Sequence, residues 1–184
     1  EHDAASAGET LVGGSRVSAP GGKGLNQAVV AARTGLLPVG FHAQLGDDPA
    51  ADLIEARLRE EDFAVLELPR WAGPTDLSIL LVGPNAENCI ITAGATALSD
   101  QDAARFAGGV RPDEWLLLQG NLTASATLTA MRAAHGRIVL NTAPLLWDVA
   151  PMLPHCAVVV ANAVEARQIT GQDDANAAAA LHAA

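Results

Sequence analysis

The stretch WLLLQGNLTASATLTAMRAAHGRIVLN, residues 115–141, decides the fold class. Along it, the pattern of apolar residues changes from strand-like to helix-like and back to strand-like. Residues 115–119 form a short apolar run typical of a buried strand, and residues 137–141 form another. Between them, residues 124–134 have the length and composition of a helix. Because parallel strands need a crossover connection, usually a helix, this stretch predicts a βαβ unit.

The alternation continues towards the C-terminus. Residues 157–161 predict a further strand, and residues 163–170 predict a helix that ends at Gly171. Asn162 precedes this helix and Glu165 follows three residues later, which is the pattern of a capping box. The same two side chains would also lie at the carboxyl end of a parallel strand, where open α/β sheets bind ligands. Spacing alone favours the cap.

The alternation also extends towards the N-terminus. Residues 23–34 predict a helix ended by Gly35, and residues 38–45 predict a buried strand. Asp48 then caps a helix that begins at Pro49, with an expected packing face of Leu53, Ile54, Arg57 and Leu58. The neighbouring Asp47 and Asp48 would also suit a metal, but capping explains Asp48 by itself. The whole pattern predicts an α/β sandwich with a parallel sheet covered on both faces.

Two segments, residues 9–20 and 75–93, do not follow the βαβ pattern and predict extended structure. The second has a turn signal at residues 83–85, so it predicts a hairpin. Strands outside the βαβ units favour a small separate sheet over one edge of the main domain. Such a sheet is where a substrate lid would be found.

The composition excludes several classes of protein. The chain has 184 residues, enough for one domain, and its 11 Lys and Arg against 21 Asp and Glu give a net charge of −10, which disfavours nucleic acid as a partner. Apolar runs are far shorter than the about 20 residues that a bilayer span needs, so no membrane segment is expected. Two distant cysteines and the lack of a signal peptide favour a cytoplasmic location. The sequence begins with Glu1 and ends within a helical pattern, so we expect truncation at both ends.

The strongest local motif is GGKGLNQ, residues 21–27, which closes a loop and opens a helix. Glycines let the backbone approach a ligand, and first-turn N–H groups can donate to an anion or a hydroxyl. The motif is not a Walker A loop, because Lys23 is followed by Gly24, and it is not a dinucleotide fingerprint, because Gln27 replaces the third glycine. A loop that merely turns the chain into the helix remains an equal alternative. Asn121 likewise could bind a polyol or cap the next helix.

The order of these motifs resembles the ribokinase-like, PfkB-type carbohydrate kinases, and within them the ribokinases most closely. The resemblance covers residues 8–171. It rests on GETLVGGSRVSAPGGKGLNQAVVAARTG at 8–35, GDD at 46–48, ENCIITAGATALS at 87–99, LLLQGN at 116–121, LNTAP at 140–144 and ANAVEARQITG at 161–171.

The resemblance implies a partial ribokinase-like kinase domain over residues 1–184, with a β lid at about 9–20 and 75–93 that often forms a dimer contact. It implies transfer of the ATP γ-phosphoryl group to the hydroxyl of a small sugar, with Mg²⁺. Sugar contacts carry over to Gly21, Gly22, Lys23, Asn26 and Asn121. Phosphate contacts carry over to Asn162 and Glu165, with Glu165 reaching Mg²⁺ through water. The two sets are expected to converge on one crevice.

Two departures from the family qualify this expectation. Ribokinases usually have Glu where this chain has Asn121, which puts ribose specificity in doubt. The family's Gly-rich anion hole with its catalytic Asp is absent from the sequence, so the base is expected beyond residue 184, and this chain is expected not to turn over alone. The alternatives are a non-catalytic sugar-binding or regulatory module and a related nucleoside kinase.

Overall fold

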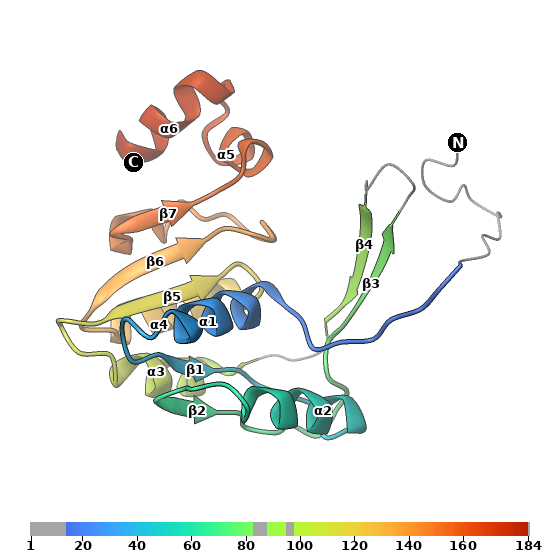
Figure 1. The fold of residues 1–184 in the computed structure, drawn as a ribbon. Helices are drawn as coiled ribbons and strands as arrows, with labels where there is room; N and C mark the ends of the chain where they lie inside the picture. Colours follow the sequence, from blue (N-terminus) through green and yellow to red (C-terminus); the bar gives the residue numbers. More distant parts are fainter. Residues whose placement is uncertain (1–13, 83–87, 95–97, 184) are drawn as a thin grey trace. The chain divides into compact units, whose positions relative to one another are not determined.

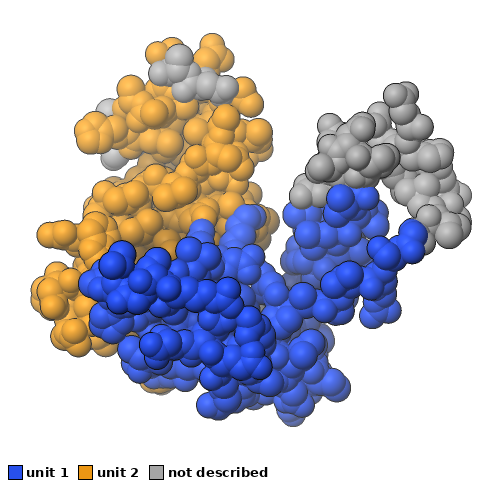
Figure 2. All heavy atoms as spheres, in the orientation of Figure 1, with its two compact units in different colours: residues 1–96 blue, residues 97–184 orange. Residues whose placement is uncertain are grey.

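A computed structural model describes residues 14–82, 88–94 and 98–183 (Figure 1). The chain divides into two compact units, which Figure 2 shows in different colours. Unit 1 is Glu1–Thr96 and unit 2 is Ala97–Ala184.

Unit 1 contains two helices and two strand pairs. Its elements are α1 (Lys23–Thr34), β1 (Gly40–His42), α2 (Pro49–Leu58), β2 (Val65–Glu67), β3 (Leu77–Val82) and β4 (Asn88–Ala93). β1 and β2 are parallel, with Phe41 opposite Leu66, whereas β3 and β4 form an antiparallel hairpin. Helix α1 has the predicted bounds, because Gly35 ends it in the left-handed conformation at φ 63°.

Two sequence predictions in unit 1 need correction. The strand predicted over residues 38–45 is only three residues long, and beyond it Leu45 makes a single bridge to Arg70. In α2 the buried residues are Ala51 and Leu58, while Leu53, expected on the packing face, is 52% exposed. Ala51 and Leu58 are about two helical turns apart on one side, and Leu53 lies about 200° around the helix from Ala51.

Of the two segments of the predicted lid, only the second forms the expected hairpin, and its role as a lid stays a prediction. Residues 75–93 contain the hairpin β3–β4, in which Leu77 pairs with Ala93 and Val82 with Asn88. The turn predicted at residues 83–85 lies outside the described residues. In the first segment, residues 14–20 form no strand and residues 9–13 are outside the described part. The described residues of this first segment are paired with no other strand, and a strand needs a partner for its backbone N–H and C=O groups.

Unit 2 is built on a three-stranded parallel sheet in the order β5-β6-β7 (Figure 1). Leu118 pairs with Leu140, and Leu140 pairs with Val159. Its elements are α3 (Asp100–Gly108), β5 (Trp115–Gln119), α4 (Ala124–Ala133), β6 (Arg137–Asn141), a 3₁₀ turn η1 (Leu153–His155), β7 (Val158–Val160), α5 (Ala163–Thr170) and α6 (Asp174–Ala183). The predicted βαβ unit is therefore confirmed.

One face of this sheet carries the core of unit 2. The small residues of α3 and α4 pack against the inward side chains of β5 and β6, forming a cluster of Ala103, Ala107, Leu118, Ala126, Ala130, Met131, Ile138, Leu140 and Met152. On the opposite face, Trp115 is 49% exposed and Val158 is 42% exposed. The α/β class with parallel strands is confirmed, but in the described residues helices of unit 2 cover this sheet on one face. Within the same residues, no helix has the length and apolar character that a membrane span needs.

Candidate functional site

The glycine-rich loop opens α1 without any side-chain cap. Gly22 has φ 114°, a value that L residues rarely adopt, and a Cβ built there would meet nothing within 4 Å. The N–H of Asn26 donates to the Gly22 carbonyl at 2.9 Å, and the first turn contains no acidic residue. Lys23 and Asn26 are exposed. The start of α1 therefore presents an ammonium, an amide and a positive helix end to solvent, which suits an oxygen-rich ligand.

The C-terminal end of α1 is fixed by an ion pair within unit 1. Arg33 Nε and Nη2 donate to Glu61 Oε2 and Oε1 at 2.8 and 2.6 Å. The Glu61 side chain is only 7% exposed, and these bonds from Arg33 are the main cause that lowers the pKa of its carboxyl group. A cavity of about 350 Å³ runs beside this pair and is lined at one end by Pro20 and Asn26. Asn26 is thus the predicted sugar contact that borders a hollow in the described part of unit 1.

In unit 2, Gly120 follows β5 and is buried against another loop. A Cβ at Gly120 would lie 2.2 Å from the carbonyl oxygen of Pro144 and 2.7 Å from that of Thr142. Glycine is required here because the neighbouring atoms are backbone. Asn121 comes next and is exposed, and α4 is capped by Thr123, whose Oγ1 accepts the Ala126 N–H at 3.1 Å. The alternative that Asn121 caps this helix is wrong.

Asn162 and Glu165 form the predicted capping box at the start of α5. The Glu165 N–H donates to Asn162 Oδ1 at 2.8 Å, and the Asn162 N–H donates to Glu165 Oε2 at 3.0 Å. The buried Thr142 hydroxyl lies 3.0 Å from the same Oε2 and 3.3 Å from the Val160 carbonyl oxygen. Both contacts to the Glu165 carboxylate, from the Asn162 N–H and the Thr142 hydroxyl, use Oε2. Glu165 is only 9% exposed.

The carboxyl ends of the three strands of unit 2 lie in register at one edge. Gln119 pairs with Asn141, and Asn141 pairs with Val160. The loops that follow these residues carry Asn121, Thr142 and the Asn162–Glu165 box, so this edge gathers the predicted site residues of unit 2. Sequence reasoning assigned no role to Thr142, although a hydroxyl residue directly after a strand at this edge was a usable signal.

The predicted sugar-loop residues and the predicted nucleotide residues belong to different units. Gly21, Gly22, Lys23 and Asn26 are in unit 1, while Asn121, Asn162 and Glu165 are in unit 2. Their expected convergence on one crevice stays a prediction.

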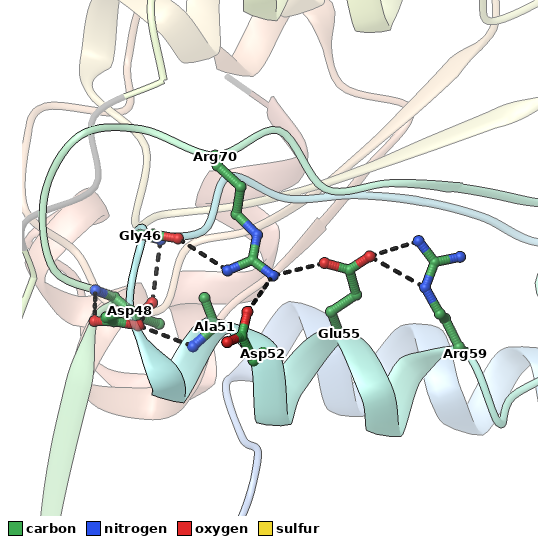
Figure 3. A network of polar contacts seen from close by, with 8 residues as sticks. Gly46, Asp48, Ala51, Asp52, Glu55, Arg59 and Arg70 are labelled. Atoms are coloured by element: carbon green, nitrogen blue, oxygen red, sulfur yellow. Dashed lines mark hydrogen bonds and ion pairs between the residues drawn. The ribbon is translucent and has the colours of Figure 1, made fainter.

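The acidic pair at residues 47 and 48 has a structural role within unit 1. Asp48 Oδ1 accepts the Ala51 N–H at 2.9 Å, so the predicted N-cap is confirmed (Figure 3). No group of three or more His, Cys, Asp or Glu side chains is placed to hold a metal ion in the described ranges. The metal interpretation of this pair therefore has no further support.

Comparison with known proteins agrees with this architecture. A ribokinase from Haemophilus influenzae is 30% identical over an alignment of 183 residues that covers 96% of this chain and 60% of that protein. Among solved structures, a ribokinase from Thermotoga maritima is 24% identical with a TM-score of 0.81, covering 97% of this chain and 61% of that one. A ribokinase from Giardia lamblia is 25% identical with a TM-score of 0.80, covering 94% and 57%. The chain thus spans about three fifths of the length of these relatives.

The family model of the pfkB carbohydrate kinases matches residues 1–184, the whole chain. This match agrees with the parallel sheet, the β hairpin and the glycine-rich start of α1 described above. The chain belongs to the pfkB family of carbohydrate kinases.

Proposed function

We propose that this chain carries the sugar-binding and nucleotide-binding residues of an ATP-dependent carbohydrate kinase, which transfers the γ-phosphoryl group of ATP to a sugar hydroxyl. Family membership supports the reaction class. The observation that carries the proposal is the Glu165 carboxylate, held through one oxygen by Asn162 and Thr142 at the carboxyl edge of the sheet. The bond from Thr142 is more than a helix cap requires, because a capping box involves only the side chains and backbone N–H groups of Asn162 and Glu165.

The sugar is proposed to bind at the start of α1. Gly21 and Gly22 leave the backbone open, while Lys23 and Asn26 supply a cationic donor and an amide that both donates and accepts. Sugar hydroxyls need such fixed donors and acceptors. Asn121 is proposed as a further sugar contact from unit 2, with a neutral amide in place of the carboxylate usual in ribokinases.

The nucleotide phosphates are proposed to bind near Asn162 and Glu165. The exposed Asn162 amide can donate to a phosphate oxygen while its Oδ1 caps α5. The carboxylate of Glu165 suits Mg²⁺, which prefers oxygen ligands and keeps several waters, so a water-mediated contact fits this donor set. Bound Mg²⁺ would neutralise charge on the phosphates during transfer. Glu165 orients that hydrated ion, and Asn162 orients the phosphate.

Two substitutions separate this role from capping. Glu165→Gln keeps an oxygen that can accept from Asn162 and Thr142 but removes the charge, and Asn162→Ser keeps a good N-cap but removes the amide. Both variants should unfold at the denaturant concentration of the parent protein. Affinity for ADP with Mg²⁺, measured by calorimetry, should fall about tenfold or more, as expected for loss of a charge-assisted contact. If both variants bound ADP with Mg²⁺ as tightly as the parent protein, Asn162 and Glu165 would act only as a helix cap.

The sugar site is tested by Lys23→Ala and by a panel of D-ribose, D-fructose and adenosine. Lys23→Ala should weaken binding of the preferred ligand without changing the fold, because Lys23 is exposed. Preference for adenosine would favour a nucleoside kinase, which the neutral Asn121 also suits. If Lys23→Ala bound the preferred ligand as tightly as the parent protein, the glycine-rich loop would have only a structural role.

Two further proposals concern the chain as a whole. Residues 1–184 contain no Gly-rich loop with a catalytic Asp, so this polypeptide alone should not consume ATP in response to sugar, and robust sugar-dependent ATP consumption would refute that. A kinase that draws on ATP is proposed to work in the cytoplasm, where Cys89 and Cys156 would stay reduced. The hairpin β3–β4 is proposed to join two copies into a homodimer.

A further inference from the structure

The segment Gly46-Asp47-Asp48 is hydrogen-bonded to the residues just before the hairpin β3–β4. Asp48 Oδ2 accepts the Thr75 N–H at 2.8 Å, and its Oδ1 accepts the Thr75 hydroxyl at 2.7 Å. The Thr75 hydroxyl oxygen in turn accepts the Gly46 N–H at 3.1 Å. Asp48 thus accepts from both hydrogen-bond donors of Thr75, which lies 27 positions away. It also caps α2 through the Ala51 N–H (Figure 3).

Packing reinforces these bonds. Gly46 is buried, and a Cβ there would lie 2.3 Å from the Thr75 nitrogen and 2.5 Å from the Gly73 carbonyl oxygen. The Asp47 N–H donates to that same Gly73 oxygen at 2.9 Å. Gly46, Asp47 and Asp48 therefore bond to Gly73 and Thr75, with no space for a side chain at Gly46 between the two backbones.

Arg70 ties the same segment to α2 from a second side. Its Nη1 lies 3.3 Å from the Gly46 carbonyl oxygen, and its Nη2 donates to Glu55 Oε2 at 2.6 Å and to Asp52 Oδ1 at 3.0 Å (Figure 3). The bond from Arg70 is the main cause that lowers the pKa of the Glu55 carboxyl group. The segment that leads into the hairpin, residues 70–75, is thus bonded to the rest of unit 1 at both of its ends, Arg70 and Thr75.

The hairpin beyond this point is exposed to solvent. β3 begins at Leu77, two residues after Thr75, and all six of its residues are exposed. Beside the root lies a cavity of about 430 Å³, whose lining includes Asp48, Ala50, Leu77 and Ala93. In the part of the chain that the structure describes, Thr75 attaches the root of the hairpin to the rest of unit 1, with this cavity beside it.

We propose that Asp48 and Thr75 form an anchor that fixes the root of the hairpin β3–β4, so that Asp48 is a positioning residue for the lid. The anchor itself stands on the contacts above. Its consequence for ligand binding rests on the proposed function: if the hairpin closes over a sugar, loosening its root weakens sugar binding although neither residue touches the sugar.

The anchor is tested by hydrogen exchange of the hairpin amides in three variants. Thr75→Val keeps the shape and the N–H but removes the hydroxyl, while Thr75→Ser restores the hydroxyl. We expect the amides of β3 and β4 to exchange about tenfold faster in Thr75→Val and within about twofold of the parent rate in Thr75→Ser. Asp52→Ala is the matched control, because it removes one exposed contact of Arg70 and leaves Asp48 and Thr75 intact. Parent-like exchange in Thr75→Val, or equal acceleration in Thr75→Ser, would overturn the anchor.

Sugar titration of the same proteins tests the consequence. Thr75→Val should raise the Kd for the preferred sugar of the panel several-fold, and Thr75→Ser should restore it. If hairpin exchange rises while the Kd stays at the parent value, the hairpin does not act as a lid, and that part of the proposal is wrong. If the parent protein binds no sugar at all, the proposed function fails, and the exchange data still decide whether the anchor exists.

Discussion

Gly120 is the residue at which the candidate site of unit 2 tolerates least change. Its missing side chain leaves the backbone of residues 142–144 close to β5, and a Cβ would lie 2.2 Å from the Pro144 oxygen. Gly120→Ala should therefore lower the free energy of unfolding by about 1–3 kcal/mol, the usual cost of overpacking. Urea denaturation measures this, with Gly108→Ala as the control, since a Cβ at Gly108 meets nothing within 4 Å. Equal stability of the two variants would contradict this account of the loop.

Asp48 makes stability depend on pH in a defined direction. Its pKa is lowered from the ordinary value, first by the Thr75 backbone N–H, then by the Thr75 hydroxyl and the Ala51 N–H. A carboxyl with a lowered folded-state pKa stabilises the protein fully above its unfolded pKa of about 3.9, and this contribution is lost as pH falls through the folded value.

The corresponding measurement compares the parent protein with Asp48→Asn across pH. The difference in their unfolding free energies should be constant from about pH 7 to pH 5 and should shrink as pH falls from about 4 towards 2. Glu55 and Glu61 also have lowered pKa values, but both proteins contain them, so their effect cancels in the difference. A gap that persists unchanged at pH 2 would mean that the charge of Asp48 is not what stabilises the fold.

Residue-level prediction from sequence succeeded where the cause was local. The caps at Asp48 and Asn162 depend on partners three residues away, so spacing alone revealed them. The bonds between Asp48 and Thr75 cross 27 positions and depend on the path of the chain between β2 and β3. Capping of α2 is a sufficient reason for an Asp at position 48, so nothing in the sequence pointed to its bonds with Thr75.

At the scale of elements, helices were better predicted than strands. Helix α1 ends where Gly35 adopts φ 63°, and α5 ends where Gly171 adopts φ 65°, both of which follow from the glycine itself. Strand β1 is shorter than its apolar run because β2 offers only three residues to pair with it. A strand's length is set by its partner, which an apolar run does not identify.

The two faces of the hairpin β3–β4 differ in polarity, and this difference determines which face is expected to join two copies of the chain. One face carries Leu77, Ile79 and Leu81 opposite Ala93, Ile91 and Cys89. The other carries Leu80, Val82 and Ile90 together with polar residues, among them the Ser78 and Thr92 hydroxyls 2.9 Å apart. The first face is wholly apolar and exposed, so it is the expected dimer contact.

Sedimentation velocity can test this assignment. Ile79→Lys places a charge on the apolar face and should shift the protein from dimer to monomer, because a buried unpaired ammonium is costly. Leu80→Lys places the same charge on the other face and should leave the dimer intact. A monomeric parent protein, or equal behaviour of the two variants, would rule out the proposed contact.

At the scale of the whole molecule, the sequence predicted the candidate site only in part. The edge formed by Asn121, Thr142 and Glu165 follows from parallel strands, whose carboxyl ends must meet at one side of a sheet. The division into two units does not follow from the spacing of apolar residues along the sequence. It depends on which apolar surfaces bury one another across long separations, and the start of α1 and the edge of β5-β6-β7 consequently fall in different units.

This division predicts unequal stability along the chain. The core cluster lies entirely in unit 2 and includes the large side chains of Leu118, Met131, Ile138, Leu140 and Met152. In the described part of unit 1, Leu45 and Leu58 are the only buried side chains of comparable size. A fully buried side chain of this kind contributes about 1.5–3 kcal/mol, so unit 2 should open far less often than unit 1.

Native-state hydrogen exchange measures the difference directly. After correction for intrinsic rates, the amides of β5 and β6 should exchange at least about a hundredfold more slowly than those of β1 and β2, because a gap of about 2.7 kcal/mol already gives that factor. A sugar that binds at the start of α1 would slow exchange in unit 1 and narrow the gap, since a ligand stabilises the state that it binds. Equal protection of both strand groups without ligand would mean that the two units open as one.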